Sequence, residues 1–277
     1  MQKYTLTGYP LGHSMSPFIH EKLFKMSGIE AVYDCTEISP EDFSAKAPLL
    51  KELNGYNITI PYKREIIPHL DELHHSAQRY GAVNCVHNHK GKSIGYNTDC
   101  DGFLMSVKSL ALSGKVLIIG CGGVGRMMAI EAILHNADLT IGIIPDAAGA
   151  AADLSDEIHS IADNCKLRIK NIDCIKGEYD LIINASPVGM YPKTDACPIS
   201  AEVIEKCGGV FDAVYNPVET KFIQLAKSFG KPAINGTAML VYQAVKAHEI
   251  WNSSYYTDEQ INKLIDETNK AIAGEQK

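Results

Sequence analysis

Val116-Leu-Ile-Ile-Gly120-Cys-Gly122-Gly123-Val124-Gly125-Arg126 lies near the middle of the 277-residue chain. Four apolar residues lead directly into glycines, and positions 127, 130 and 134 are then apolar, which is a helical spacing. The pattern predicts a buried strand, a sharp turn and a helix whose free N-terminal amides can receive a phosphate. Gly120, Gly122 and Gly125 match the usual Gly-x-Gly-x-x-Gly spacing. Because a lone glycine pattern has many false positives, an ordinary strand–helix turn with incidental glycines is the alternative interpretation.

Strand and helix patterns alternate on both sides of this turn. We expect strands at 3–7, 32–38, 56–60, 139–144, 167–169, 180–184 and 209–214, and a hairpin over 82–96. We expect helices at 16–26, after 39, near 63, at 102–112, 147–161 and 237–252, and after the capping box 257–260. This alternation predicts an α/β protein with a mostly parallel first lobe and a Rossmann-type, doubly wound second lobe that begins near Asp99.

Composition excludes several classes of protein. The net charge is −7 and the isoelectric point is near 5.8, which argues against a nucleic-acid binder. Apolar runs are too short to span a bilayer, and the first residues lack the apolar stretch of a secretory signal. The eight cysteines are scattered, so we expect reduced thiols in a cytoplasmic protein. The histidine pairs 74–75 and 87–89 lack a third ligand at suitable spacing, so we expect no metal site.

Small polar residues and one lysine follow several of the predicted strands. Ser14 and Ser16 flank a predicted helix start, where backbone amides and the helix dipole favour an anion such as a carboxylate. Lys63 follows a strand end, and Asp99 lies at the lobe boundary, where clefts form. The alternatives are that Ser16 and Asp99 only cap helices and that Lys63 is a solvated surface lysine. Polar turns after residues 184 and 212 favour a cofactor cleft in the second lobe.

These stretches together resemble the shikimate dehydrogenase family, including its quinate/shikimate branch, over nearly the whole chain. The motifs are Gly12-His13-Ser14-x-Ser16-Pro17, Asn57-Ile-Thr59-Ile-Pro61-x-Lys63, Gly81-Ala-Val-Asn84, Asn97-Thr98-Asp99, the glycine turn, Asn184-Ala-Ser-Pro-x-Gly-Met190, Val214-Tyr215-Asn-Pro217 and Gly236-x-x-Met239-Leu-x-x-Gln243. Each motif alone is weak, but their order and spacing together are specific.

The resemblance implies an NAD(P)-dependent oxidoreductase of aromatic amino-acid biosynthesis that interconverts shikimate and 3-dehydroshikimate. Lys63 and Asp99 match the catalytic pair, and Ser14 and Ser16 match the residues that hold the substrate carboxylate. Further matches to substrate-binding residues are Thr59, Asn84, Tyr215 and Gln243. Matches to cofactor-binding residues are Gly120, Gly122, Gly123, Val124, Ala213 and Gly236, with Asp146 as the candidate for the adenosine ribose. The implied partners are a small-molecule substrate and, in a dimer, a second copy; we expect a monomer or homodimer, no nucleic acid and no membrane.

The family's fold also implies a discontinuous substrate domain. We expect this domain to comprise residues 1–98 and 238–277, and the dinucleotide-binding domain to comprise residues 99–237.

The chain departs from the family where members that use NADP carry an Asn-Arg-Ser/Thr motif and a nearby basic residue. The matching stretch is 142–148, and residues 139–165 contain no lysine or arginine but five acidic residues. We therefore expect NAD to be used at least as well as NADP, although a basic residue from elsewhere, such as Arg126, is the alternative phosphate reader. Other functions left open are a quinate or aminoshikimate dehydrogenase and a non-enzymatic ligand sensor.

Overall fold

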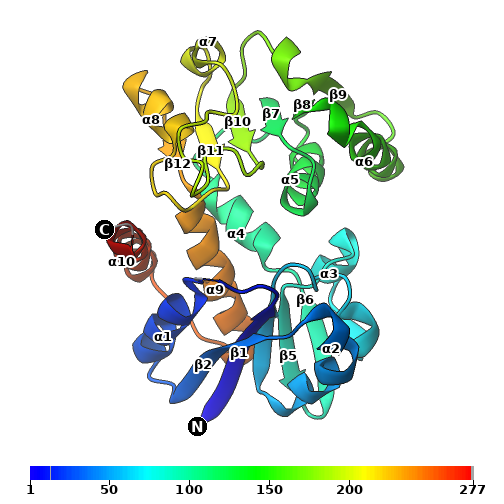
Figure 1. Ribbon diagram of the computed structural model, residues 1–277, viewed down its shortest axis with the longest axis vertical. Coiled ribbons are helices and arrows are strands. Elements are labelled where there is room, and N and C mark those ends of the chain that lie inside the picture. The colour runs from blue at the N-terminus through cyan, green and yellow to red at the C-terminus, as the bar shows by residue number, and fades with distance from the viewer. Residues whose placement is uncertain (13, 276–277) are drawn as a thin grey trace. The chain divides into compact units, whose positions relative to one another are not determined.

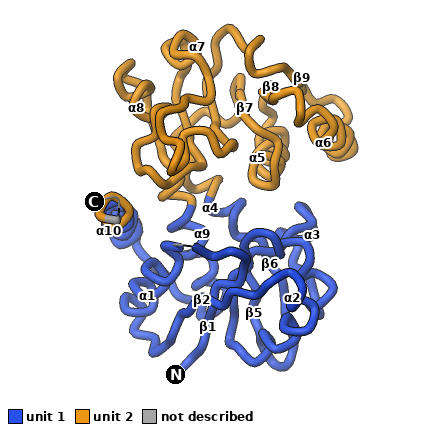
Figure 2. The backbone as a smooth tube through the Cα atoms, viewed as in Figure 1, with its two compact units in different colours: residues 1–102, 240–270 blue, residues 103–239, 271–277 orange. Residues whose placement is uncertain are grey.

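The computed structural model describes residues 1–12 and 14–275, so His13 of the first motif lies outside the described residues. The chain forms two compact units (Figure 2). Unit 1 comprises Met1–Gly102 and Leu240–Lys270, and unit 2 comprises Phe103–Met239 and Ala271–Lys277. The chain passes from unit 1 into unit 2 within helix α4 (Asp99–Ser106) and returns within α9 (Gly236–Asn252).

Unit 1 contains a mixed six-stranded sheet with the order β2-β1-β3-β5-β6-β4. Figure 1 labels β1, β2, β5 and β6 of this sheet. The strands are β1 (Gln2–Gly8), β2 (Ala31–Glu37), β3 (Gly55–Ile58), β4 (Glu72–Leu73), β5 (Cys85–His89) and β6 (Lys92–Tyr96). β1 is parallel to β2 and β3, whereas β5 is antiparallel to β3 and β6. The predicted hairpin is therefore β5–β6, with a two-residue turn at Lys90 and Gly91, both at positive φ.

Each face of this sheet has its own apolar core. The helical elements of the unit are α1 (Ser16–Ser27), α2 (Pro40–Lys46), η1 (Ala47–Glu52), η2 (Ile67–His69), α3 (His75–Tyr80), and the greater parts of α9 and α10 (Asp258–Glu275). Tyr56 of β3 packs with residues of α2, η1 and α3 on one face. Tyr4 and Tyr33 pack with residues of α1 and α9 on the other face. The alternation of side chains along a strand explains why Cys85 and Val86, which are adjacent in β5, enter different cores.

The chain's one tryptophan fixes α9 against the sheet. The Trp251 ring lies 4.7 Å from the Tyr4 ring between centroids, and its Nε1 donates to the Val86 carbonyl at 2.9 Å. Only glycine fits beneath it, since a Cβ on Gly55 would lie 2.5 Å from Trp251 Nε1. Helix α9 comes late in the sequence but completes the core around the first strand.

Unit 2 is built on a fully parallel sheet with the order β12-β11-β10-β7-β8-β9. Its strands are β7 (Lys115–Ile119), β8 (Asp138–Ile143), β9 (Lys166–Asn171), β10 (Leu181–Asn184), β11 (Val210–Asp212) and β12 (Ala233–Ile234). Its helices besides α4 include α5 (Gly123–Leu134), η3 (Pro145–Ala147), α6 (Ala148–Ile161), η4 (Ile172–Cys174), α7 (Ala201–Glu205) and α8 (Lys221–Ser228). The strand order reverses direction at β7, as in a doubly wound nucleotide-binding sheet.

Three local predictions were wrong. Ser16 does not cap α1 but is its first residue, and it is the Ser14 hydroxyl that accepts from the Ser16 amide at 3.2 Å. No helix begins near Lys63; the segment forms turns closed by short-range bonds, and Pro68 lies within the following η2. The helix expected at 102–112 is α4, which begins at Asp99 and ends at Ser106.

Three further features concern the cysteines, possible metal ligands and membrane-spanning helices. All eight cysteines are described and are free thiols. Within residues 1–12 and 14–275, no three His, Cys, Asp or Glu side chains gather in a way that would hold a metal ion. None of the helices in the described part of the chain combines the length and apolarity needed to cross a membrane.

Candidate functional site

Polar residues of unit 1 gather at one edge of its sheet. β3 ends at Ile58 and β6 ends at Tyr96, so the residues that follow these strands emerge at the same edge. Because β5 runs antiparallel to both, the residue before it, Asn84, also lies at this edge. The sheet topology thus brings together side chains from motifs that are far apart in the sequence.

Lys63 and Asp99 form the charged centre of this edge. Lys63 Nζ lies 2.6 Å from Asp99 Oδ2, and the side chains keep 27% and 17% of their exposure. The Lys63 carbonyl accepts from the Val83 amide at 2.7 Å, which anchors the loop that carries the lysine. Asp99 lies in the first turn of α4, where the helix dipole favours a carboxylate, and its amide donates to Asn97 Oδ1. The ammonium is therefore held at a partly solvent-accessible position by a fixed carboxylate.

The Asn84 side chain ties this ion pair to its neighbours. Its Nδ2 lies 2.9 Å from Asp99 Oδ1 and 3.0 Å from Thr98 Oγ1, and its Oδ1 accepts from the Thr98 amide at 2.7 Å. Both oxygens of the Asp99 carboxylate are thus engaged, one by Lys63 and one by Asn84. The sequence suggested that Asn84 contacts the substrate. The structure adds that Asn84 orients the carboxylate of Asp99.

Two further predicted substrate residues border the same group. Thr98 Oγ1 lies 3.5 Å from Gln243 Oε1, and Gln243 Nε2 donates to the Leu240 carbonyl of its own helix at 2.9 Å. Thr59 follows β3, is half-buried, and donates its amide to the Thr7 carbonyl at 2.9 Å. Gln243 reaches this edge because α9 returns to unit 1.

Ser14 and Ser16 lie at the start of α1. Ser16 is buried, whereas Ser14 is half-buried and precedes the helix. The helix has no side-chain cap at Met15, its N-cap residue, and no acidic residue in its first turn. Its positive end is therefore not neutralised by the residues of its own first turn, which is the environment that an anion needs.

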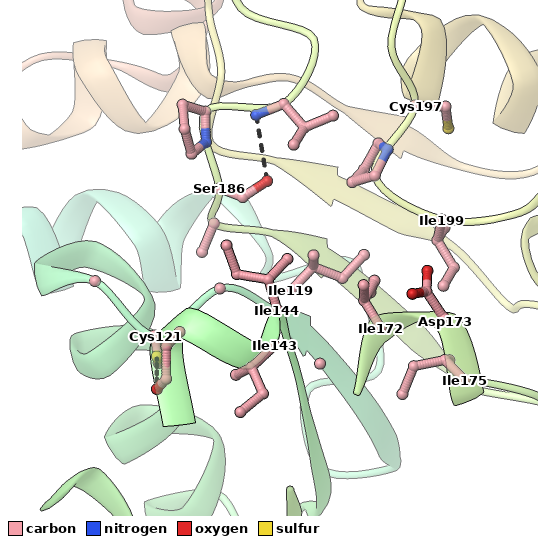
Figure 3. A pocket seen from close by; sticks show the side chains of 18 of the residues that line it. Ile119, Cys121, Ile143, Ile144, Ile172, Asp173, Ile175, Ser186, Cys197 and Ile199 are labelled. Atoms are coloured by element: carbon pink, nitrogen blue, oxygen red, sulfur yellow. Dashed lines mark hydrogen bonds between the residues drawn. The ribbon is translucent and has the colours of Figure 1, made fainter. Parts of the chain in front are cut away.

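A cavity of about 860 Å³ lies at the carboxyl ends of the unit 2 strands (Figure 3). Its volume falls within the range of small-molecule sites. It is lined by the end of β7 and the glycine turn, the end of β8 and the start of α6, η4, and the loop after β10. Figure 3 shows isoleucine side chains from several of these segments around it. Such an apolar cavity beside a glycine turn fits the flat base of a nucleotide.

Glycine is required at two positions of the turn itself. Gly120 has φ of 98°, and a Cβ on Gly125 would lie 2.3 Å from the Gly120 carbonyl oxygen. These glycines let α5 start directly against the end of β7. Gly122 precedes α5 and provides no side-chain cap, so the helix N-terminus is open to an anion. Gly120 and Gly122 line the cavity, while Gly123 and Val124 form the first turn of α5.

Asp146 and Arg126, the charged candidates named from the sequence, are not among the residues that line this cavity. Asp146 lies in η3 and is exposed. Among the described residues that line it, Asp173 alone carries a charge. Arg126 donates from Nε to Glu157 Oε2 at 2.6 Å, and Nη2 contacts Oε1 of the same carboxylate. Nothing in the sequence distinguishes Asp173 from the other acidic residues, and only the fold places it at the cavity.

The remaining cofactor candidates lie together near the end of β11. The Ala213 amide donates to the Asn184 carbonyl at 2.8 Å, and a Cβ on Gly236 would lie 2.3 Å from the Ala213 carbonyl oxygen. Asp212, which sequence reasoning did not select, fixes this turn through Thr220, Asn184 and the Val214 amide. Burial raises the pKa of Asp212 to about 6. Tyr215 follows in the same segment of unit 2, and its role stays a prediction.

The arrangement in unit 1 is suited to proton transfer or charge stabilisation at an oxygen atom. Lys63 can donate a proton or a hydrogen bond, and Asp99 can orient it and accept from a hydroxyl. Sequence reasoning selected both residues but missed Asn57 and Thr98 as supporting groups, although their motifs contained them.

Comparison with known proteins points to one family. Residues 6–86 match a family model described as the shikimate dehydrogenase substrate binding domain. A shikimate dehydrogenase (NADP⁺) from Shouchella clausii is 37% identical over 257 residues, which cover 90% of this chain and 92% of the relative.

Solved structures agree with this result. A shikimate 5-dehydrogenase from Thermus thermophilus, in complex with NADP(H) and shikimate, has a TM-score of 0.85 at 28% identity, covering 97% of this chain and 100% of that chain. A shikimate 5-dehydrogenase from Listeria monocytogenes, in complex with shikimate and NAD, has a TM-score of 0.85 at 27% identity, covering 96% of both chains.

Proposed function

The chain belongs to the shikimate dehydrogenase family, and on that premise we propose that it interconverts shikimate and 3-dehydroshikimate, with Lys63 and Asp99 as the catalytic pair. The observation that carries the assignment of residues is the 2.6 Å contact between Lys63 Nζ and Asp99 Oδ2 at the polar edge of unit 1. Lys63 donates to the oxygen that gains negative charge when the ketone is reduced. Asp99 holds Lys63 in place and accepts from a substrate hydroxyl.

The substrate roles follow from the chemistry of each group. Ser14 and Ser16 donate to the substrate carboxylate beside the open N-terminus of α1. Thr59, Asn84 and Gln243 are assigned to the ring hydroxyls, with Tyr215 as a further substrate contact. Buried hydrogen-bonding groups that pair with substrate hydroxyls give the site selectivity, because an analogue that lacks a hydroxyl leaves them unpaired.

The residues of unit 2 fit a nicotinamide dinucleotide. Gly120, Gly122, Gly123 and Val124 would hold the pyrophosphate at the open helix end, and the apolar cavity would receive the adenosine. Ala213 and Gly236 are assigned as further cofactor contacts. When bound, the cofactor supplies or accepts the hydride, while the protein provides orientation and the proton.

We further propose that NAD is used at least as well as NADP. A 2′-phosphate is normally paired with arginine or lysine, but residues 139–165 contain neither, and the charged side chain that lines the cavity, Asp173, is acidic. Arg126 is engaged by Glu157. The assignment of Asp146 to the ribose stays a prediction.

The cofactor preference is tested by kcat/KM for NAD and NADP at one ionic strength. A tenfold preference for NADP, about 1.4 kcal/mol, would contradict the proposal and reveal a phosphate site. Arg126→Gln serves as the matched variant, because its ratio of the two kcat/KM values should equal that of the wild type.

The overall function is tested by steady-state assays that cross shikimate and quinate with both cofactors. We expect turnover of shikimate. Turnover of quinate alone would assign the other branch, and an amino analogue of shikimate tests the third substrate. Binding of shikimate without any turnover would favour a ligand sensor.

A further inference from the structure

Behind the catalytic pair lies a chain of buried hydrogen bonds that the proposed mechanism does not use. It begins at Tyr33 of β2 and runs through Asn57 of β3 to Asn84. Tyr33 Oη donates to Asn57 Oδ1 at 2.7 Å, and Asn57 Nδ2 donates to the Asn84 carbonyl at 3.1 Å. All three residues are buried.

The distance that this chain spans calls for a long side chain. β2 and β3 flank β1, with Tyr33 opposite Tyr4 and Asn57 opposite Leu6. Tyr33 therefore reaches across the full width of β1, on the face where Tyr4 and Leu6 are packed. Adjacent strands lie about 4.8 Å apart, so a short polar residue at position 33 would not reach the Asn57 amide.

The direction of each hydrogen bond follows from the first. A phenol donates one proton, and here that proton goes to Asn57 Oδ1. This fixes which end of the Asn57 amide is its oxygen, so that the NH₂ end faces the Asn84 carbonyl. The same carbonyl accepts from the Ile58 amide at 2.9 Å. The Asn84 carbonyl is thereby held by two hydrogen bonds from β3, and the Asn84 side chain holds Asp99 Oδ1 and the Thr98 amide.

The Tyr33 ring is itself held in place by stacking. It lies 4.0 Å from the His20 ring between centroids, with 6° between the ring planes. Phenylalanine at position 33 keeps this stacking and loses only the hydroxyl.

We infer that Tyr33 is a positioning residue: its hydroxyl sets the Asn57 amide, which holds Asn84 and through it Asp99 in the orientation that pairs with Lys63. The inference rests on the proposed function of Lys63 and Asp99.

The test uses Tyr33→Phe, which keeps the ring and its stacking but removes the hydroxyl. We expect kcat for shikimate oxidation to fall roughly tenfold, the scale of leaving one buried acceptor without its donor. KM for shikimate should stay close to the wild-type value, because the substitution removes no group assigned to the substrate. Tyr4→Phe is the matched control. Tyr4 faces Tyr33 across the strand pair, but its hydroxyl contacts Gln2 and Asn252 instead, so kcat should stay within twofold of wild type.

A double-mutant cycle shows whether Tyr33 acts through Asn57. In an Asn57→Ala background, Tyr33→Phe should change kcat less than twofold, since the group that it orients is gone. If Asn57→Ala does not fold by circular dichroism, Asn57→Ser takes its place. A full tenfold loss in that background, an unchanged kcat in Tyr33→Phe, or a raised KM at unchanged kcat would each overturn the inference. A wild-type enzyme that fails to oxidise shikimate would instead refute the proposed function.

Discussion

At the scale of single residues, Lys63 and Asp99 depend on each other unequally. Asp99 is supported by Asn84 and by the dipole of α4 as well as by Lys63, whereas the Lys63 ammonium is directed by its contact with Asp99. Loss of the lysine leaves a carboxylate that is still supported. Loss of the carboxylate leaves the lysine chain without the contact that directs it.

We predict that Lys63→Ala lowers kcat for shikimate by about 10²–10⁴, the usual scale for loss of an acid/base group. Asp99→Asn should also lower kcat, because it removes the charge that positions the ammonium. Both proteins should stay folded, since neither side chain lies in an apolar core. Lys51→Ala, which removes an exposed ion pair with Asp71 in the same unit, should leave kcat unchanged. A Lys63→Ala enzyme with near wild-type kcat would remove Lys63 from the chemistry.

At the scale of elements, the start of α1 acts as an anion site only if its serines recognise the negative charge of the substrate carboxylate. We predict that Ser14→Ala with Ser16→Ala raises KM for shikimate more than KM for the cofactor. The methyl ester of shikimate should bind the wild type much more weakly than shikimate does, and the double variant only slightly more weakly. Isothermal titration measures both affinities. Equal losses in the two proteins would show that these serines do not recognise the carboxylate.

Elements with long periodic patterns were predictable from sequence, and those fixed by tertiary contacts were not. The strand–turn–helix unit at β7 and α5 was found because glycine and apolar periodicity agree there. The capping box at Thr257 was confirmed, with Gln260 and Thr257 bonding reciprocally. The turn that carries Lys63 was missed, because its backbone is fixed by a bond from the distant Val83 amide. The same limit hid Asn57, whose partners come from other strands.

At the scale of the whole molecule, unit 1 joins the two ends of the sequence through a buried histidine pair. His20 Nδ1 of α1 lies 3.1 Å from His248 Nε2 of α9, and Tyr256 Oη lies 2.9 Å from His248 Nδ1. Burial lowers the pKa of His248 to about 3, and burial together with His248 lowers the pKa of His20 well below its usual value. Both rings are therefore neutral in the folded protein at neutral pH.

We predict that this pair makes the protein less stable in acid. The unfolded chain takes up protons at these histidines as pH falls below about 6.5, while the folded chain does not. Above about pH 6.5 these histidines therefore do not lower the free energy of unfolding. Between there and about pH 3, the pKa of folded His248, the free energy of unfolding falls by up to about 1.4 kcal/mol per histidine per pH unit. Urea unfolding from pH 7 to pH 5 measures the slope. His248→Gln should flatten it, and the exposed His89→Gln should not; equal slopes in all three proteins would exclude the pair as the cause.

Trp251 lies in unit 1, packed on Tyr4 and bonded to Val86, and it is the chain's one tryptophan. Its fluorescence, excited at a wavelength that spares tyrosine, therefore reports the loss of structure in one unit, while far-ultraviolet circular dichroism reports both. Addition of shikimate, assigned to unit 1, should move the fluorescence transition to higher urea concentration by mass action. Addition of a nucleotide fragment such as ADP-ribose, assigned to unit 2, should move the dichroism transition of unit 2 to higher urea concentration. The fluorescence transition, which reports unit 1, should change little. The protein thus carries a natural optical label that separates the folding of its two halves.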